Sequence, residues 1–332
     1  MLAIVVPEPG GPEQLRVVDR PVPEPGPGEV LVRVVAAGVN RADLLQRQGH
    51  YPPPRGASDV LGLECAGRVA ELGPTSSDDP PSRWQVGDPC LALLAAGGYA
   101  EYVRVPVGQL MPPPPGIDLV TAAGLVEVAA TVVSNLDAAA LQAGETILIH
   151  GGTGGIGSMA IQYAKSLGAT VAATAGSAAK LDYCRSIGAD LAVSYRDDWT
   201  GAVRNLTDGR GADVILDVIG ARYLEQHVQL LAVGGRLVVI GLQGGTKATL
   251  DLGRLLGVRG SVLATTLRSR PTAQKAAICR RTEEAVWPLL AEGTIVPAPQ
   301  TRFALQNVVE AHRHLESGDN LGKIVLTVDG QG

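Results

Sequence analysis

The residues with the clearest chemical meaning form a glycine-rich segment at 150–157, His-Gly-Gly-Thr-Gly-Gly-Ile-Gly. Its G-x-G-x-x-G spacing stands between an apolar strand expected at 146–150 and a helix expected at 158–167, as a dinucleotide-binding loop requires. Side chains at these glycines would keep the backbone N–H groups at the helix N-terminus away from a pyrophosphate. The alternative is a tight turn with only a structural role. The predicted cofactor contacts of this loop are Gly152, Gly154, Gly155, Ile156 and Gly157.

The same segment has a second enzymatic interpretation, in which His150-Gly151-Gly152 forms the oxyanion loop of a hydrolase. That interpretation needs a nucleophile in a G-x-S-x-G turn. The sequence contains no such motif, so this interpretation of the segment fails.

The next strand–helix junction selects the cofactor. NAD-dependent enzymes place Asp or Glu there, where it binds the ribose 2′-hydroxyl. Residues 158–179 include no acidic residue, and the strand expected at 169–175 leads to Ser177 and Lys180. A small hydroxyl and a cation suit a 2′-phosphate, which a carboxylate would repel. NADPH is therefore the expected cofactor, the alternative being that Lys180 is an ordinary solvated helix lysine.

Composition limits the other function classes. The 332 residues are enough for two domains, and 45% apolar with 18% charged residues is typical of a globular protein. The net charge of −5, without a basic stripe, argues against a nucleic-acid partner. No apolar run is long enough to span a bilayer, and the N-terminus has no basic leader. Four scattered cysteines without CxxC spacing predict small buried thiols in a reducing, cytoplasmic setting.

The expected elements change character along the chain. The first third predicts short, mostly antiparallel strands with Pro/Gly turns. After about residue 121, strands alternate with helices, which predicts a doubly wound parallel sheet. The tail predicts helices at 271–292 and 305–317 and a last strand at 323–328. The remaining expected strands are Leu2–Val6, Leu15–Arg20, Glu29–Ala37, Asp59–Leu72, Tyr99–Val105, Val214–Val218 and Arg236–Leu242, and the remaining expected helices are Ala178–Ile187 and Tyr223–Ala232.

Several further segments carry a family resemblance. They are Asn40-Arg41-Ala42-Asp43-Leu44-Leu45-Gln46-Arg47-Gln48-Gly49, Tyr51-Pro52-Pro53-Pro54, Leu61-Gly62-Leu63-Glu64, Thr174-Ala175-Gly176-Ser177, Leu267-Arg268-Ser269-Arg270 and Asn320-Leu321-Gly322-Lys323-Ile324-Val325-Leu326. Together with the loop they resemble the zinc-independent medium-chain dehydrogenases/reductases, within them the zeta-crystallin-like quinone oxidoreductases and the tumour-suppressor-inducible branch of these. The cysteine and the Gly-His-Glu of the zinc alcohol dehydrogenases are replaced, which predicts that no metal is bound.

The resemblance implies an α/β fold with two domains. A Rossmann domain at 122–267 is expected to be inserted in a mostly antiparallel, GroES-like catalytic domain at 1–121 and 268–332. Homo-oligomerisation is implied as well, as a homodimer or homotetramer, with the cofactor-domain edge near Ser261–Thr266 as the expected contact.

The resemblance also assigns roles by position. Asn40 and Tyr51 would border the nicotinamide and the substrate, with Thr131 near the nicotinamide ribose. Residues expected around the 2′-phosphate are Ser177, Lys180 and Tyr195. Residues expected beside the nicotinamide or over the cofactor are Gly241, Thr265, Thr266, Leu267 and Asn320. The residues alone permit plainer interpretations, in which Tyr51 anchors a loop, Asn40 caps a turn and His150 is a packed histidine. Relatives have a hydroxyl residue or Ala at Gly154 and a Pro-Glu-aromatic pattern at 126–130, and these departures bear on rate and substrate shape.

The implied activity is two-electron reduction of a small-molecule quinone by hydride transfer from NADPH, without metal. A quinone is already electrophilic, so the protein has to orient the reactants and stabilise charge on the acceptor oxygen. Two alternatives remain open. One is reduction of an enoyl or other activated alkene by the same hydride chemistry, and the other is a cofactor-binding sensor or structural protein with negligible turnover.

Overall fold

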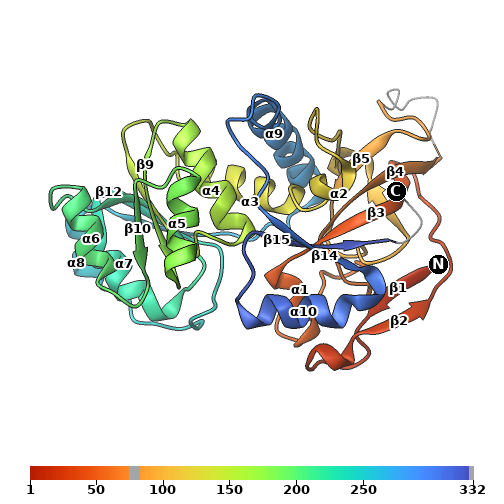
Figure 1. Cartoon of the computed structure of the whole chain (residues 1–332), viewed down its shortest axis with the longest axis horizontal. Coiled ribbons are helices and arrows are strands. Elements are labelled where there is room, and N and C mark those ends of the chain that lie inside the picture. Colours follow the sequence, from red (N-terminus) through yellow and green to blue (C-terminus); the bar gives the residue numbers. More distant parts are fainter. Residues whose placement is uncertain (75–82, 329–332) are drawn as a thin grey trace. The chain divides into compact units, whose positions relative to one another are not determined.

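The computed structural model describes residues 1–74 and 83–328 (Figure 1). The chain divides into two compact units, Met1–Ala130 with Leu267–Gly332 and Thr131–Thr266. The first division lies nine residues beyond the expected boundary at 121. It falls inside one continuous helix, α3 (Val126–Ala138), which the two units share.

The second unit contains a six-stranded sheet with the order β10-β9-β8-β11-β12-β13. All neighbouring strands in it are parallel. Counted from β8, this is the 3-2-1-4-5-6 order of a doubly wound dinucleotide-binding sheet, which confirms the predicted fold class. The strands are β8 (Thr146–Ile149), β9 (Thr170–Ala175), β10 (Leu191–Ser194), β11 (Ala212–Asp217), β12 (Leu231–Val239) and β13 (Ser261–Ala264).

Helices follow the strands of this sheet in sequence (Figure 1). They are α4 (Gly155–Ser166), α5 (Ala178–Ser186), α6 (Trp199–Leu206), α7 (Leu224–Leu230) and α8 (Leu252–Gly257), with a short 3₁₀ turn at Ala221–Tyr223. The helix expected at 223–232 ends earlier than predicted. Leu231 and Ala232 already belong to β12, where both are buried, and an apolar run of this kind does not distinguish a helix end from a buried strand start.

The first unit contains a mostly antiparallel sheet with the order β14-β15-β3-β4-β5-β7, and β6 also pairs with β3. A separate antiparallel pair joins β1 and β2. The last strand, β15, pairs antiparallel with β3, so the tail joins the sheet of the first unit. The strands are β1 (Leu2–Val5), β2 (Arg16–Asp19), β3 (Glu29–Val39), β4 (Glu64–Leu72), β5 (Pro89–Leu93), β6 (Tyr102–Pro106), β7 (Leu110–Met111), β14 (Gln300–Ala304) and β15 (Lys323–Thr327).

The helices of the first unit include both predicted tail helices (Figure 1). Besides α3, they are α1 (Arg41–Arg47), α2 (Leu119–Ala122), α9 (Thr272–Ala291) and α10 (Val308–Ser317), with 3₁₀ turns at Pro12–Gln14, Val107–Gln109 and Leu305–Asn307. The sequence did not predict α1, because seven residues are too few for a clear helical period.

Two other expectations concern the surface and the thiols. β13 lies at the edge of its sheet, as predicted, and the pairing of two copies there stays a prediction. All four cysteines are buried and free, which agrees with the prediction of small buried hydrophobes.

No helix in the described part of the chain has the length and apolar character needed to cross a membrane.

Candidate cofactor loop and acceptor residues

The glycine loop has two positions where only glycine fits. A Cβ at Gly157 would lie 2.2 Å from the Gly151 carbonyl oxygen and 2.6 Å from the Cα of Gly152. A Cβ at Gly152 would lie 2.7 Å from the Cys184 sulfur. Gly154, in contrast, has ample space, since its Cβ would come no nearer than 3.8 Å to any other atom. The loop thus needs glycine at its ends and tolerates a side chain at its middle position.

The helix that follows the loop presents an uncapped N-terminus. Gly154 is the N-cap residue of α4, no side chain accepts a hydrogen bond from its first turn, and that turn includes no acidic residue. The backbone N–H groups of Gly155, Ile156 and Gly157 therefore keep their donors, and the helix dipole favours an anion there. This arrangement fits the pyrophosphate of a dinucleotide.

The ends of β9 and β10 bring together the residues expected at the 2′-phosphate. Ser177 is the N-cap residue of α5, with no hydrogen bond from its side chain to that helix, and Lys180 lies in the first turn. The Tyr195 backbone N–H donates to the Ala175 carbonyl over 3.2 Å, which fixes Tyr195 beside this junction. Asp182 is the one acidic residue in the described elements β9, α5 and β10, and it lies beyond the first turn of α5.

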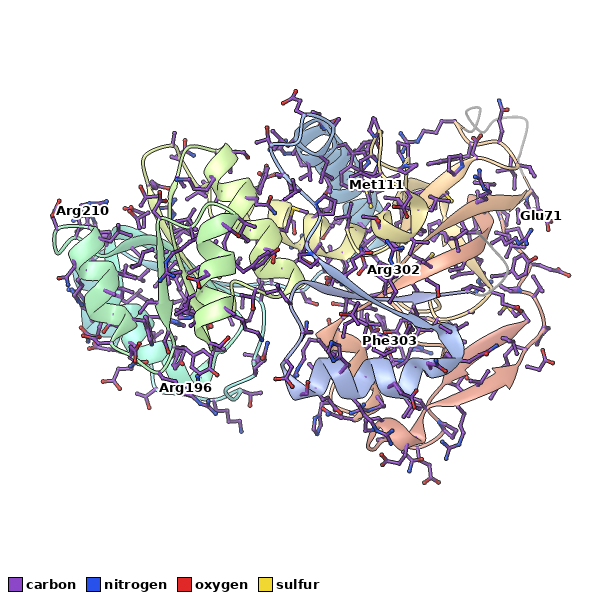
Figure 2. The ribbon with its side chains drawn as sticks, viewed as in Figure 1. Glu71, Met111, Arg196, Arg210, Arg302 and Phe303 are labelled. Atoms are coloured by element: carbon purple, nitrogen blue, oxygen red, sulfur yellow. The ribbon has the colours of Figure 1, made fainter. Side chains whose placement is uncertain are left out.

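A cation that the sequence interpretation missed adjoins this group. This residue is Arg196, which is labelled in Figure 2. Its guanidinium lies over the Tyr195 ring, 4.8 Å from the ring centroid, and also donates to the Gly176 carbonyl. Arg196 follows β10, so only the pairing of β10 with β9 brings it to Gly176. The sequence could have indicated Arg196 because it directly follows Tyr195, just after β10.

The predicted ribose and nicotinamide residues of the second unit are linked by Asn135. The Asn135 amide donates to the Thr131 carbonyl over 2.8 Å, and the Thr265 hydroxyl donates to the Asn135 carbonyl oxygen. Thr266 follows at the end of this unit. Gly241 packs against the segment after β11, since a Cβ there would lie 2.9 Å from the Val218 oxygen. Asn135 was missed because it lies four residues along α3 from Thr131, where it resembles an ordinary core amide.

In the first unit, Asn40 belongs to a buried ion-pair network. Its Nδ2 donates to Glu64 Oε1 over 2.9 Å, and its Oδ1 accepts from the Lys323 ammonium, which lies 2.7 Å from Glu64 Oε1. The other Glu64 oxygen accepts from the backbone N–H of Glu127, at the start of α3. Asn40 also precedes α1 as its N-cap residue, and its predicted role at the acceptor stays a prediction.

Asp43 is a second buried carboxyl beside that network. Its Oδ2 accepts from the Asn40 backbone N–H over 2.8 Å and from the Tyr99 hydroxyl over 3.0 Å, whereas Oδ1 has no partner among the described residues. Burial raises the pKa of Asp43 to about 6, against the lowering effect of these hydrogen bonds.

We expect Asp43 to make the protein less stable as the pH rises from about 4 to about 6. Since the pKa of Asp43 is 3.8 for an exposed carboxyl and about 6 when folded, the native state binds more protons across this window. Stability then falls with rising pH, by up to ~3 kcal/mol for this group. In Asp43→Asn, the amide oxygen can still accept from both donors and this contribution disappears.

Urea unfolding of both proteins at a series of pH values measures the effect. The free energy of unfolding of Asp43→Asn should rise relative to that of the original protein between pH 4 and 6, because all other carboxyls are shared. Parallel pH profiles for the two proteins would contradict the assignment.

Tyr51 is held by Arg268. The Arg268 guanidinium donates to the Tyr51 backbone carbonyl over 3.0 Å and lies over the Tyr51 ring, 5.2 Å from its centroid. It also donates to the side-chain oxygen of Gln46 on α1 and to the Ala95 carbonyl. The Tyr51 loop is therefore held through its backbone carbonyl, and the cation above the ring orients it. The predicted role of Tyr51 at the acceptor stays a prediction.

The remaining predicted residues of the first unit have simple local roles. Leu267 begins the chain's return to this unit. The Asn320 side chain donates to the Gly322 carbonyl over 3.4 Å, within the turn before β15. Their predicted contacts with the cofactor stay predictions.

His150 is a packed core histidine. Its Nε2 lies 2.8 Å from His227 Nε2, its Nδ1 lies 3.0 Å from the Thr174 hydroxyl, and its ring packs edge-on against Trp199. Burial, and then the neighbouring His227, hold the pKa of His150 well below its usual range. A neutral buried imidazole with these partners supports the loop rather than chemistry.

Comparison with known proteins agrees with this architecture. Residues 26–115 match the model of the alcohol dehydrogenase GroES-like domain, and residues 155–282 match that of the zinc-binding dehydrogenases. Over 324 residues the chain is 34% identical to a quinone oxidoreductase of Pseudomonas aeruginosa, and the match covers 96% of each protein. The chain belongs to the medium-chain dehydrogenase/reductase family. Within it, the chain is like the zinc-independent quinone oxidoreductases, as the resemblance predicted.

Other family members connect the chain with different reactions. The solved structure of an Escherichia coli quinone oxidoreductase complexed with NADPH is 28% identical and superposes with a TM-score of 0.85, covering 98% of this chain and all of that one. A 2-haloacrylate reductase of Burkholderia is 29% identical, over 98% of each protein. A polyketide synthase subunit of Mycobacterium tuberculosis is 30% identical over 98% of this chain, which spans only 15% of that protein's length.

Although one matching model is named for zinc, the positions of the zinc ligands hold other residues here. The stretch after β3 reads Asn40-Arg41-Ala42-Asp43, and Gly62-Leu63-Glu64 stands where zinc enzymes have Gly-His-Glu. Glu64 is already paired with Lys323. The described residues include no group of three His, Cys, Asp or Glu side chains able to hold a metal ion.

Proposed function

We propose that this family member is an NADPH-dependent, metal-independent quinone reductase. The proposal rests chiefly on the phosphate-binding features of the second unit, where an uncapped helix follows the glycine loop and Lys180 and Arg196 adjoin the end of β9. The quinone oxidoreductases among the relatives, one of them solved with NADPH, support both the cofactor and the acceptor.

The residues of the chain would bind and orient rather than form covalent intermediates. The N–H groups at the start of α4 bind the pyrophosphate, and Ser177, Lys180 and Arg196 bind the 2′-phosphate. When bound, the nicotinamide supplies the hydride. The Tyr51 hydroxyl donates a hydrogen bond to the acceptor oxygen on which negative charge develops, and solvent completes the protonation.

For Tyr51→Phe we expect a turnover about 10-fold slower, with NADPH affinity unchanged. The change removes one hydrogen bond to the developing oxyanion, which is worth about 1.4 kcal/mol. The ring beneath Arg268 is kept, so the loop should hold its conformation. Steady-state rates with a simple quinone, together with NADPH titration, measure both quantities. Complete loss of turnover with intact NADPH binding would contradict this role for Tyr51.

Reduction of an activated alkene is the second candidate, because the 2-haloacrylate reductase matches the chain over almost its whole length. Both reactions use the same hydride, and a sensor without turnover would bind the same cofactor. The decisive assay follows NADPH and then NADH consumption with several quinones, with 2-chloroacrylate, with an enoyl thioester and with no acceptor. Fast oxidation of NADPH by quinones alone supports the proposal. Oxidation by the alkenes alone assigns the second candidate, and binding without any turnover assigns a sensor.

A further inference from the structure

The first unit contains a cavity of about 890 Å³ for which the proposed function assigns no ligand. Its walls come from the segment after Tyr51, from the loop after β5, from β6 and from the start of α9. The cationic residues in its lining are Arg20, Arg55, Arg104, Arg268, Arg270 and Lys275, and the acidic ones are Glu29 and Asp59.

Both acidic residues already have cations beside them. Asp59 lies 2.7 Å from the Arg20 guanidinium, and Glu29 lies 4.0 Å from that of Arg104. Arg268 donates its hydrogen bonds to neutral acceptors, the carbonyls of Tyr51 and Ala95 and the Gln46 amide. The cavity wall therefore keeps an excess of positive charge.

Lys275 is a nearly buried cation in the wall of this cavity. It is 5% exposed and lines the cavity, and among the described residues no hydrogen-bond acceptor or carboxylate pairs with its ammonium. Burial lowers the pKa of Lys275. The ammonium is not one of the fully enclosed polar atoms without a partner, so it is open to the cavity, where an anion could pair with it.

The start of α9 adds backbone donors at the same place. Pro271 and Thr272 line the cavity, no side chain caps the helix, and its first turn includes no acidic residue. Lys275 is the fourth residue of this helix, and helical side chains lean toward the N-terminus. Its ammonium and the free N–H groups of the first turn thus serve the same end of a 20-residue helix.

We propose that this cavity binds a phosphate group, held by Lys275, by the N-terminus of α9 and by the Arg268 N–H groups that are not used on Tyr51, Ala95 and Gln46. A phosphate supplies the negative charge and several acceptor oxygens that an ammonium and a row of helix N–H groups can satisfy together. Arg268 also orients Tyr51, so an occupied cavity adjoins the predicted acceptor residue. The binding itself does not depend on the reaction proposed above.

Binding of pyrophosphate and of inorganic phosphate to the NADPH-saturated protein tests the site, because saturation fills the phosphate sites of the cofactor. Isothermal titration of the original protein should show binding, and Lys275→Met should weaken it at least about 10-fold. Arg280→Met is the matched control. It removes one positive charge from an exposed position on the same helix, outside the cavity lining, and should change the affinity less than about twofold.

A second variant keeps the test valid if Lys275→Met does not fold. Thr272→Asp places a carboxylate in the exposed first turn of α9, which favours the helix and repels an anion. It should weaken pyrophosphate binding at least about 10-fold as well. Failure of the NADPH-saturated original protein to bind either anion overturns the proposal, as does unchanged affinity in a folded Lys275→Met or Thr272→Asp.

The source of the phosphate follows from turnover with and without pyrophosphate. Competition with the acceptor would indicate that the site takes the phosphate end of the acceptor itself. Inhibition or activation that is not competitive, or no effect on turnover, would indicate a separate phosphate ligand. Each of these results is compatible with the phosphate site and identifies only the source of its ligand. The titration does not depend on turnover, so it tests the site even if the protein reduces no quinone.

Discussion

Gly157→Ala should lower the affinity for NADPH at least about 100-fold. The new Cβ would lie 2.2 Å from the Gly151 carbonyl oxygen and within 2.8 Å of two backbone atoms of Gly152. Neither neighbour is a flexible side chain, so the loop backbone has to move away from the start of α4. The N–H groups that we propose bind the pyrophosphate are then displaced from the geometry that the loop imposes. A loss of about 100-fold corresponds to roughly 2.7 kcal/mol, or one to two charge-assisted hydrogen bonds.

Gly154→Ala is the control within the same loop. Gly154 has φ −74°, which any residue adopts, and its Cβ would meet only the Gly151 oxygen, at 3.8 Å. This variant should bind NADPH within about twofold of the original protein. Titration of NADPH fluorescence gives both affinities, and circular dichroism checks that the variants remain folded. Equal affinities for Gly157→Ala and Gly154→Ala would contradict the steric argument.

The second unit could be predicted from sequence because its signals are local. The glycine loop, the apolar strand before it and the helix after it lie close together in one short stretch of the sequence. The same local pattern recurs at β9 and β11, and the strand order then follows from the doubly wound topology. Arg196 escaped this reasoning because its approach to Gly176 depends on the pairing of β9 with β10.

The first unit was less predictable because its polar interior joins distant segments. Asn40 and Lys323 are 283 positions apart, and Glu64 comes from a third segment. Each residue was noticed, through the family resemblance, yet nothing local indicates that the three pair with one another. Lys275 is a similar case, since only burial distinguishes it from the exposed lysines typical of helices.

Lys323→Met should destabilise the protein by about 3–5 kcal/mol, because it leaves the fully buried Glu64 carboxylate without its cation. The Asn40 amide and the Glu127 backbone N–H still donate to that carboxylate, so the fold should survive with reduced stability. Urea unfolding measures the loss. The matched control is Lys165→Met, which breaks a pair of similar length, 2.9 Å, whose side chains are each 37% exposed, and which should cost no more than about 1 kcal/mol.

The double variant Glu64→Gln/Lys323→Met separates a buried charge from a lost contact. The introduced glutamine would keep an oxygen for the Glu127 N–H but carry no charge, so most of the stability should return, as it does when both members of a buried pair are neutralised. If the double variant is as unstable as Lys323→Met, the lysine contributes through its packing instead. Because Asn40 is fixed between Glu64 and Lys323, recovery of stability should be accompanied by recovery of the α1 segment that leads to Tyr51, and with it the rate of acceptor reduction.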